Sequence, residues 1–191
     1  MKGMTSKYRS AGFSIFELVI VVGIAGILAA IGTSSFKYVT TANRISAETN
    51  GLLGDLQFAR SEAQKEGQYI TLCPANLTGT ACASPGTTNW SVGWIVFVDL
   101  NDNHAYDAAT EGTILRWQKA ISPDVLQGGA ATLKYVTFNR EGFADSGATT
   151  SWGTLILNST PVNPNYKRCI AISAVGAIKS EIGGASVPTT C

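Results

Sequence analysis

The sequence lacks the short motifs that mark common enzymes. Its 191 residues contain no P-loop, no GxGxxG motif and no nucleophile elbow, and the only histidine is His104. A Ser-His-Asp arrangement would depend wholly on His104, which lies in a predicted turn, so we interpret it as a surface residue. No CxxC pair is present, which leaves a zinc site little support. The sequence predicts a protein that is not an enzyme and that has no cofactor and no metal.

Excess charge of either sign is also lacking, since 14 basic and 13 acidic residues give a formal net charge of +1. This balance does not indicate a strongly basic nucleic-acid-binding protein. A DNA contact would need a local patch, and the candidate is the group formed by Lys167, Arg168 and Lys179. The alternative is that these side chains belong to a solvated strand edge.

Charge is nearly absent from one long stretch, Phe13–Gly32, which reads FSIFELVIVVGIAGILAAIG and has Glu17 as its one charged residue. The stretch is close to the roughly 20 residues with which a helix crosses a bilayer. Lys2, Lys7 and Arg9 precede it and no acidic residue does, which is typical of an N terminus that stays in the cytoplasm. The pattern predicts one membrane-spanning helix followed by an exported domain.

Glu17 leaves alternatives open. A carboxylate at the centre of a bilayer costs about 2.5–3.5 kcal/mol, so such a residue usually has a function. Because Glu17 lies only four residues into the stretch, it could instead reach the lipid headgroups. The stretch could also be an ordinary secretory signal peptide cut near Gly32, although an early glutamate fits such a segment poorly.

Helical periodicity continues beyond this stretch. No proline occurs between Thr33 and Glu66, and Gly67 is a good C-cap. Apolar residues recur on one helical face, at Ile45, Leu52, Leu56, Ala59 and Ala63. We predict one helix from Phe13 to about Glu66, whose second half packs on a domain. The alternative is a pair of helices broken near Thr33-Ser34-Ser35.

Strand patterns dominate the remainder. Val92–Asp99 is the clearest, since it is rich in aromatic and β-branched residues. The other predicted strands are Tyr69–Cys73, Thr113–Lys119, Leu133–Asn139, Gly153–Leu157, Arg168–Ser173 and Gly176–Glu181. A long helix followed by a mostly antiparallel sheet is an α+β order.

Two features of this region suggest ligands but have simpler interpretations. Asp99–Asn103 begins like a calcium loop, yet His104 replaces its glycine and Thr110 its bidentate glutamate, so we favour a turn with local side-chain hydrogen bonds. Trp94 and Trp117 fall inside predicted strands, so we expect tryptophans here to pack in a sheet rather than to stack on bases.

Four cysteines, Cys73, Cys82, Cys169 and Cys191, all follow the apolar stretch. An even number in an exported domain favours disulfides, and four cysteines allow three pairings. Proximity along the chain favours Cys73–Cys82 and Cys169–Cys191, each of which closes a short loop.

The N terminus has a basic leader, then Gly12-Phe13, and then Glu17 as the fifth residue counted from Phe13. In these features it resembles the class III signal of type IV pilins and type II secretion pseudopilins. The resemblance implies cleavage after Gly12 by a prepilin peptidase and N-methylation of Phe13. It also implies that Glu17 pairs with the N-terminal amine of a neighbouring subunit. Removal of the leader with its three basic residues leaves 11 basic and 13 acidic residues, a formal charge near −2.

The downstream blocks CPANLTGTAC, WSVGWIVFVDLNDNHAYDAATEGTILR, FNREGFADSG, GTLIL and RCIAISAVGAIK resemble the FimT/GspH group of minor pilins and H-type pseudopilins. The resemblance implies a pilin-like α+β fold: a leader (1–12), the transmembrane and assembly half of the helix (13–37), and a periplasmic domain (38–191). It implies a single-pass inner-membrane protein that assembles with other major and minor pilins or pseudopilins, with a membrane-anchored domain that never polymerises as an alternative.

DNA uptake at the pilus tip is a further alternative function. Some FimT-like minor pilins carry a Gly-Arg-x-Arg stretch that is associated with DNA binding. The corresponding stretch here is Gly176-Ala177-Ile178-Lys179, which lacks both arginines.

Overall fold

The computed structural model describes residues 12–84, 87–129, 133–147 and 152–183, and for residues 31–35 and 152 the backbone alone. The chain divides into two compact units at Thr40–Thr41. Helix α1 (Ile15–Glu66) extends through both. The unit that begins at Thr41 also contains all the described strands.

Helix α1 is continuous from Ile15 to Glu66, which confirms the single-helix prediction and rules out a break near Thr33. Gly67 ends it in the left-handed conformation, with φ of +68°, and its N–H donates to the carbonyl of Ala63 at 2.9 Å. The sequence predicted a membrane-spanning segment over residues 13–37. In the part of the chain that the structure describes, no helix has both the length and the apolarity that a bilayer crossing requires.

The domain half of α1 buries the face that the periodicity predicts. The five predicted side chains, Ile45, Leu52, Leu56, Ala59 and Ala63, are each at most 1% exposed. Thr49 lies on the same face and is also buried. Its hydroxyl is satisfied within the helix, because it donates to the carbonyl of Ile45 at 2.7 Å. The spacing of apolar residues is therefore sufficient to orient α1 on the domain.

Two antiparallel sheets form the rest of the domain. In spatial order, the five-stranded sheet is β3 (Arg116–Lys119), β2 (Gly93–Asp99), β1 (Tyr69–Pro74), β5 (Val136–Phe138) and β6 (Ala144–Asp145). The four-stranded sheet is β4 (Val125–Gly128), β7 (Trp152–Asn158), β8 (Arg168–Ser173) and β9 (Ile178–Ile182). Among the described residues, the short 3-10 helices η1 (Trp90–Val92) and η3 (Pro164–Tyr166) precede β2 and β8.

The sequence predicted a single sheet and missed β4 and β6. These strands have four and two residues, too few for a period-two pattern to stand out. The strands predicted at Thr113–Lys119 and Leu133–Asn139 are shorter than expected. The first of them begins only at Arg116, and the second extends only from Val136 to Phe138. The prediction of an α+β fold with antiparallel strands is confirmed.

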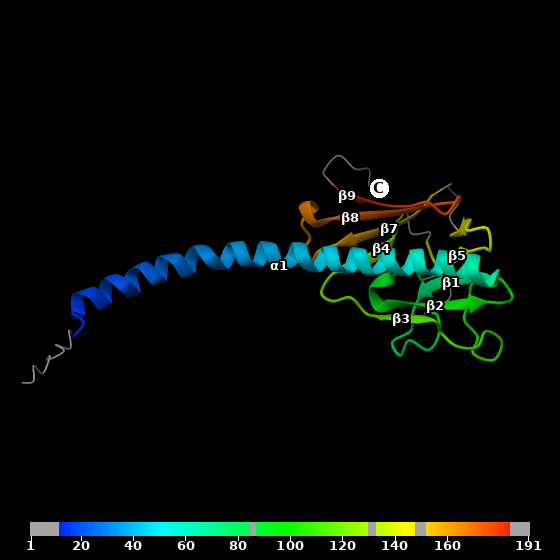
Figure 1. Cartoon of the computed structure of the whole chain (residues 1–191), viewed down its shortest axis with the longest axis horizontal. Coiled ribbons are helices and arrows are strands. Elements are labelled where there is room, and N and C mark those ends of the chain that lie inside the picture. Colours follow the sequence, from blue (N-terminus) through cyan, green and yellow to red (C-terminus); the bar gives the residue numbers. More distant parts are fainter. Residues whose placement is uncertain (1–11, 85–86, 130–132, 148–151, 184–191) are drawn as a thin grey trace, which may run out of the picture. The chain divides into compact units, whose positions relative to one another are not determined.

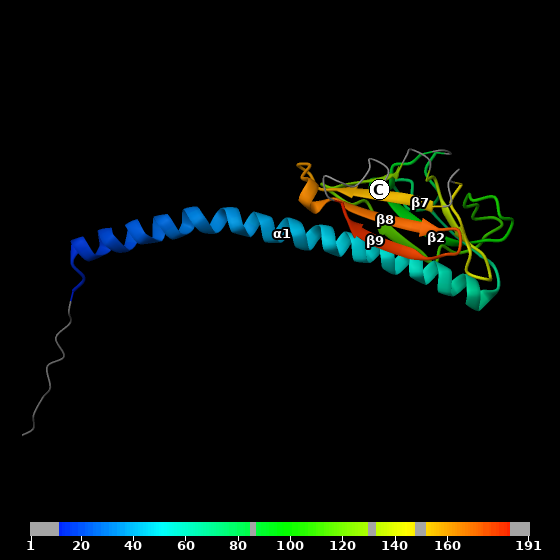
Figure 2. The ribbon, with the colours of Figure 1, turned by 90° about the horizontal axis from the view of Figure 1, so that it is seen from above.

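One hydrophobic core joins α1 to both sheets. It contains the buried face of α1 together with side chains of β1, β2, β4, β5, β7 and β8. In Figure 1 the four-stranded sheet lies on one side of the domain half of α1 and β1, β2 and β3 lie on the other, and Figure 2 shows β7, β8 and β9 running along the helix. A second cluster, formed by Cys73, Ala75, Ile95 and Phe97, covers the opposite face of β1 and β2. This double coverage explains why β2 is apolar at almost every position.

Candidate functional site

The N terminus of α1 contains the residues of the predicted processing and assembly site. Gly12 and Phe13 precede the helix, and Glu17 lies in its first turn. The hydroxyl of Ser14 accepts the N–H of Phe16 at 3.3 Å, so Ser14 caps the helix and Glu17 occupies the position of the acidic residue in a capping box. Sequence reasoning missed this local role, although the Ser-x-x-Glu spacing signals it.

Large apolar side chains are exposed along the first turns of α1. Between Phe13 and Leu28 they range from 45% exposed at Ile20 to 84% at Ile15. The members are Phe13, Ile15, Phe16, Leu18, Val19, Ile20, Val21, Val22, Ile24, Ile27 and Leu28. Because burying one such side chain is worth about 1.5–3 kcal/mol, a segment of this kind is stable only where lipid or other protein covers it.

The strand register separates the basic residues that were candidates for DNA contact. Arg168 pairs with Ile182 and Lys179 pairs with Ala171, so the two lie three positions apart along β8 and β9. Side chains alternate between the faces of a sheet, so an odd separation puts Arg168 and Lys179 on opposite faces. Lys167 ends η3 beside Arg168. The three residues therefore do not form one patch.

The Cys73–Cys82 disulfide is present and joins β1 to the loop that follows it. Within this loop the side chain of Asn76 accepts the N–H of Thr80 at 2.9 Å. Cys169 is not a free thiol, and its predicted partner Cys191 lies outside the described residues.

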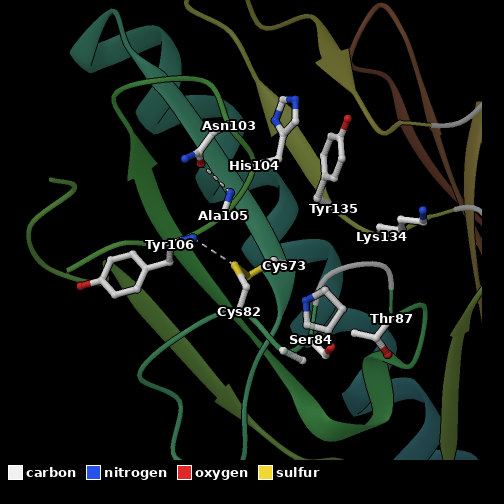
Figure 3. A pocket seen from close by; sticks show the side chains of 12 residues that line it. Cys73, Cys82, Ser84, Thr87, Asn103, His104, Ala105, Tyr106, Lys134 and Tyr135 are labelled. Atoms are coloured by element: carbon white, nitrogen blue, oxygen red, sulfur yellow. Dashed lines mark hydrogen bonds between the residues drawn. A yellow bond between two sulfur atoms is a disulfide. The ribbon is translucent and has the colours of Figure 1, made fainter. Parts of the chain in front are cut away.

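A cavity of about 290 Å³ opens beside this disulfide (Figure 3). Its lining is mainly apolar and comes from the disulfide, the loop between β2 and β3, and the residues before β5. Polar residues in the lining include Ser84, Thr87, Asn103, His104, Lys134 and Tyr135. The ring of His104 stacks on that of Tyr135, with 3.9 Å between the ring centroids and 10° between the ring planes. The side chain of His104 is therefore only 22% exposed, which is less than expected for the surface residue that the sequence predicted.

A chain of hydrogen bonds connects His104 to the interior of the sheet. The hydroxyl of Thr71 donates to Asp99 Oδ2 at 2.9 Å and also contacts the hydroxyl of Thr137 at 2.7 Å, and Thr137 contacts His104 Nδ1 at 3.0 Å. Each hydroxyl has a single hydrogen. Thr71 uses its hydrogen on Asp99, so Thr137 donates to Thr71 and His104 Nδ1 donates to Thr137. The ring proton is therefore on Nδ1.

The carboxylates beside His104 have the chemistry of metal ligands. Asp99, Asp102 and His104 have ligand atoms within 4.8 Å of one another. Asp99, however, already accepts the backbone N–H groups of Asn103 at 3.1 Å and His104 at 2.9 Å. These contacts hold the loop after β2, which confirms the interpretation of Asp99–Asn103 as a turn with local side-chain hydrogen bonds. Among the described residues, the hydroxyl that contacts His104 Nδ1 is that of Thr137, which is buried in the sheet.

Two of the three tryptophans whose side chains the structure describes are buried. Trp90 and Trp94 are at most 1% exposed, as expected for packing within the fold. Trp117 differs, since it is 46% exposed and its indole lies against Gly79 of the disulfide loop.

Comparisons with known proteins agree with this architecture. A family model described as type II transport protein GspH matches residues 48–176. The type IV minor pilin FimU of Pseudomonas aeruginosa has a similar crystal structure: 18% identity, TM-score 0.53, covering 73% of this chain and 89% of FimU. A second crystal form of FimU gives 19% identity and a TM-score of 0.48, covering 74% and 90%. A search of curated proteins gives no match.

Proposed function

Since its match over residues 48–176 shows that the chain belongs to the GspH family of minor pilins and pseudopilins, we propose that it is a structural subunit that enters a filament through its N-terminal helix. The filament is a type IV pilus or the pseudopilus of a type II secretion system. The partners are other major and minor pilins or pseudopilins. The protein helps to prime or extend the filament and catalyses no reaction.

The exposed apolar side chains between Phe13 and Leu28 carry this proposal. Residues 13–37 lie in the inner membrane before assembly and among the helices of neighbouring subunits afterwards, while residues 38–191 form the periplasmic domain. Both surroundings remove the same apolar surface from water, so extraction from lipid into a filament costs little hydrophobic free energy.

Processing prepares the N terminus for this transfer. A prepilin peptidase removes residues 1–12 by cutting after Gly12, and the new amine of Phe13 is methylated. Glu17 then pairs with the amine of a neighbouring subunit, because a carboxylate buried among apolar helices needs an opposite charge. The intact mass of the membrane-extracted protein tests this step. A mass that matches an unprocessed chain, or cleavage near Gly32, would contradict it.

Glu17→Ala tests the assembly role, and Ser14→Ala is the matched control for the capping role of the same turn. We expect Glu17→Ala to remain folded and membrane-inserted but to be depleted from sheared filaments. Ser14→Ala loses about 1 kcal/mol of capping and should still enter filaments. Immunoblots of the inner-membrane and sheared-filament fractions compare the two. Equal entry of Glu17→Ala and the parent would show that Glu17 serves only its own helix.

DNA uptake gains no support as a second function. The basic residues Arg168 and Lys179 occupy opposite faces of the four-stranded sheet, and phosphate binding draws on basic side chains that act together.

A further inference from the structure

Helix α1 presents two ionisable side chains, one turn apart, to a single buried carboxylate. Arg44 and Glu48 lie near the start of the domain part of α1, and Asp124 lies in the segment just before β4. The side chain of Asp124 is fully buried. Arg44 donates to it twice, from Nε to Oδ2 at 2.5 Å and from Nη2 to Oδ1 at 2.9 Å. The backbone N–H of Thr160, which follows β7, adds a third bond at 2.9 Å.

These three donors make Asp124 the ionised member of the group. A carboxylate that accepts several N–H bonds, two of them from a guanidinium, is favoured in its charged form. Glu48 is in the opposite situation, because its Oε2 is buried and has no hydrogen-bond partner. A buried carboxylate oxygen without a donor is costly when charged and much less so when protonated.

The charged groups that act on Glu48 are Asp124 from the facing segment and Arg44 from its own helix. Burial, and after it the negative charge of Asp124, raises the pKa of Glu48 to about 7, against the opposing effect of Arg44. One guanidinium thus serves two carboxyl groups, and it is already engaged by Asp124. A neutral Glu48 removes the repulsion between the two carboxyl groups.

We propose that Arg44, Glu48 and Asp124 form a proton-sensitive clasp that sets how firmly α1 is held against the segments before β4 and after β7. The clasp is closed when Glu48 is protonated. When Glu48 ionises, two negative charges share one guanidinium, and the contact between helix and domain weakens. The inference concerns the packing of the domain alone and does not depend on the proposed role in filaments.

The direction of the pH effect follows from linkage. The folded chain retains a proton on Glu48 that the unfolded or opened chain releases, so the contribution is fully present below about pH 4.5 and is lost as the pH rises through about 7. The rise in the pKa of Glu48 from 4.5 to about 7 limits the change in the opening equilibrium to about 300-fold. Glu48 is partly accessible to solvent, so we expect screening to reduce the change to about tenfold.

Hydrogen–deuterium exchange on the full chain in detergent micelles tests the clasp. Exchange of residues 41–52 and 121–128 is compared at about pH 5.5 and about pH 8, after correction for the intrinsic rate. Glu48→Gln keeps the shape of the neutral side chain and stays uncharged at both pH values. Glu62→Gln, which replaces a partly buried glutamate of the same helix that pairs with Lys65, is the matched control.

We expect the parent and Glu62→Gln to open about tenfold more at the higher pH, and Glu48→Gln to open equally at both. At about pH 8 Glu48→Gln should also be better protected than the parent. A parent whose opening does not change with pH, or a Glu48→Gln variant that keeps the pH dependence of the parent, would overturn the proposal.

Discussion

Replacement of Asp55 tests how α1 holds the edge of the five-stranded sheet. Asp55 Oδ2 accepts the indole N–H of Trp94 in β2 at 2.8 Å, and Oδ1 accepts Arg116 Nη1 of β3 at 2.8 Å. Arg116 also lies over the ring of Phe58, 3.7 Å from its centroid. One helical carboxylate therefore connects two neighbouring strands to α1.

The two bonds of Asp55 differ in value because their partners differ in burial. Trp94 is 1% exposed, so an indole N–H left without a partner costs about 1–3 kcal/mol. The side chain of Arg116 is 46% exposed, so its ion pair contributes about 0.2–1 kcal/mol. Asp55→Ala loses both, and we expect it to lower the free energy of unfolding by about 1–4 kcal/mol. Asp55→Asn keeps an oxygen for the indole and should lose only about 1 kcal/mol.

Urea unfolding of the full chain in detergent, followed by circular dichroism, measures these differences. Trp94→Phe is the control background, because it removes the indole N–H and leaves Asp55 in place. In that background Asp55→Ala should cost no more than the ion pair, about 1 kcal/mol or less. Equal losses for Asp55→Ala and Asp55→Asn, or an undiminished loss in the Trp94→Phe background, would refute the reasoning.

Three further predictions concern turns, disulfides and DNA. Gly176→Ala should destabilise the domain by at least about 1 kcal/mol more than Gly112→Ala. Both glycines have positive φ (+76° and +72°), but only a methyl group at position 176 would overlap the carbonyl of Gly142. Denaturant midpoints of the two variants check this. Non-reducing peptide mapping should give a Cys169–Cys191 peptide, and a Cys169 peptide linked elsewhere would contradict the local pairing. Anisotropy titration with duplex DNA near physiological salt should show binding weaker than micromolar, since the processed chain is slightly acidic.

Local patterns were enough to predict α1 and most strands. A helical face is a repeat within seven residues, so the apolar series from Ile45 to Ala63 marked the buried side of α1 without reference to any other element. The apolar run of β2 and the C-cap at Gly67 are signals of the same range. The short spacing of Cys73 and Cys82 favoured their pairing among the three possible ones, and the structure confirms it.

Only the tertiary structure decided which side chains meet. The Arg44–Asp124 pair spans 80 residues and the Arg116–Asp55 pair spans 61, and neither leaves a periodic trace in the sequence. The register of β8 and β9 separated Arg168 from Lys179, which the sequence had suggested as members of one basic cluster near the C terminus. The physical reason is that local patterns report how a segment meets water, whereas pairing, burial of charge and proton position depend on the groups that folding brings together from distant parts of the chain.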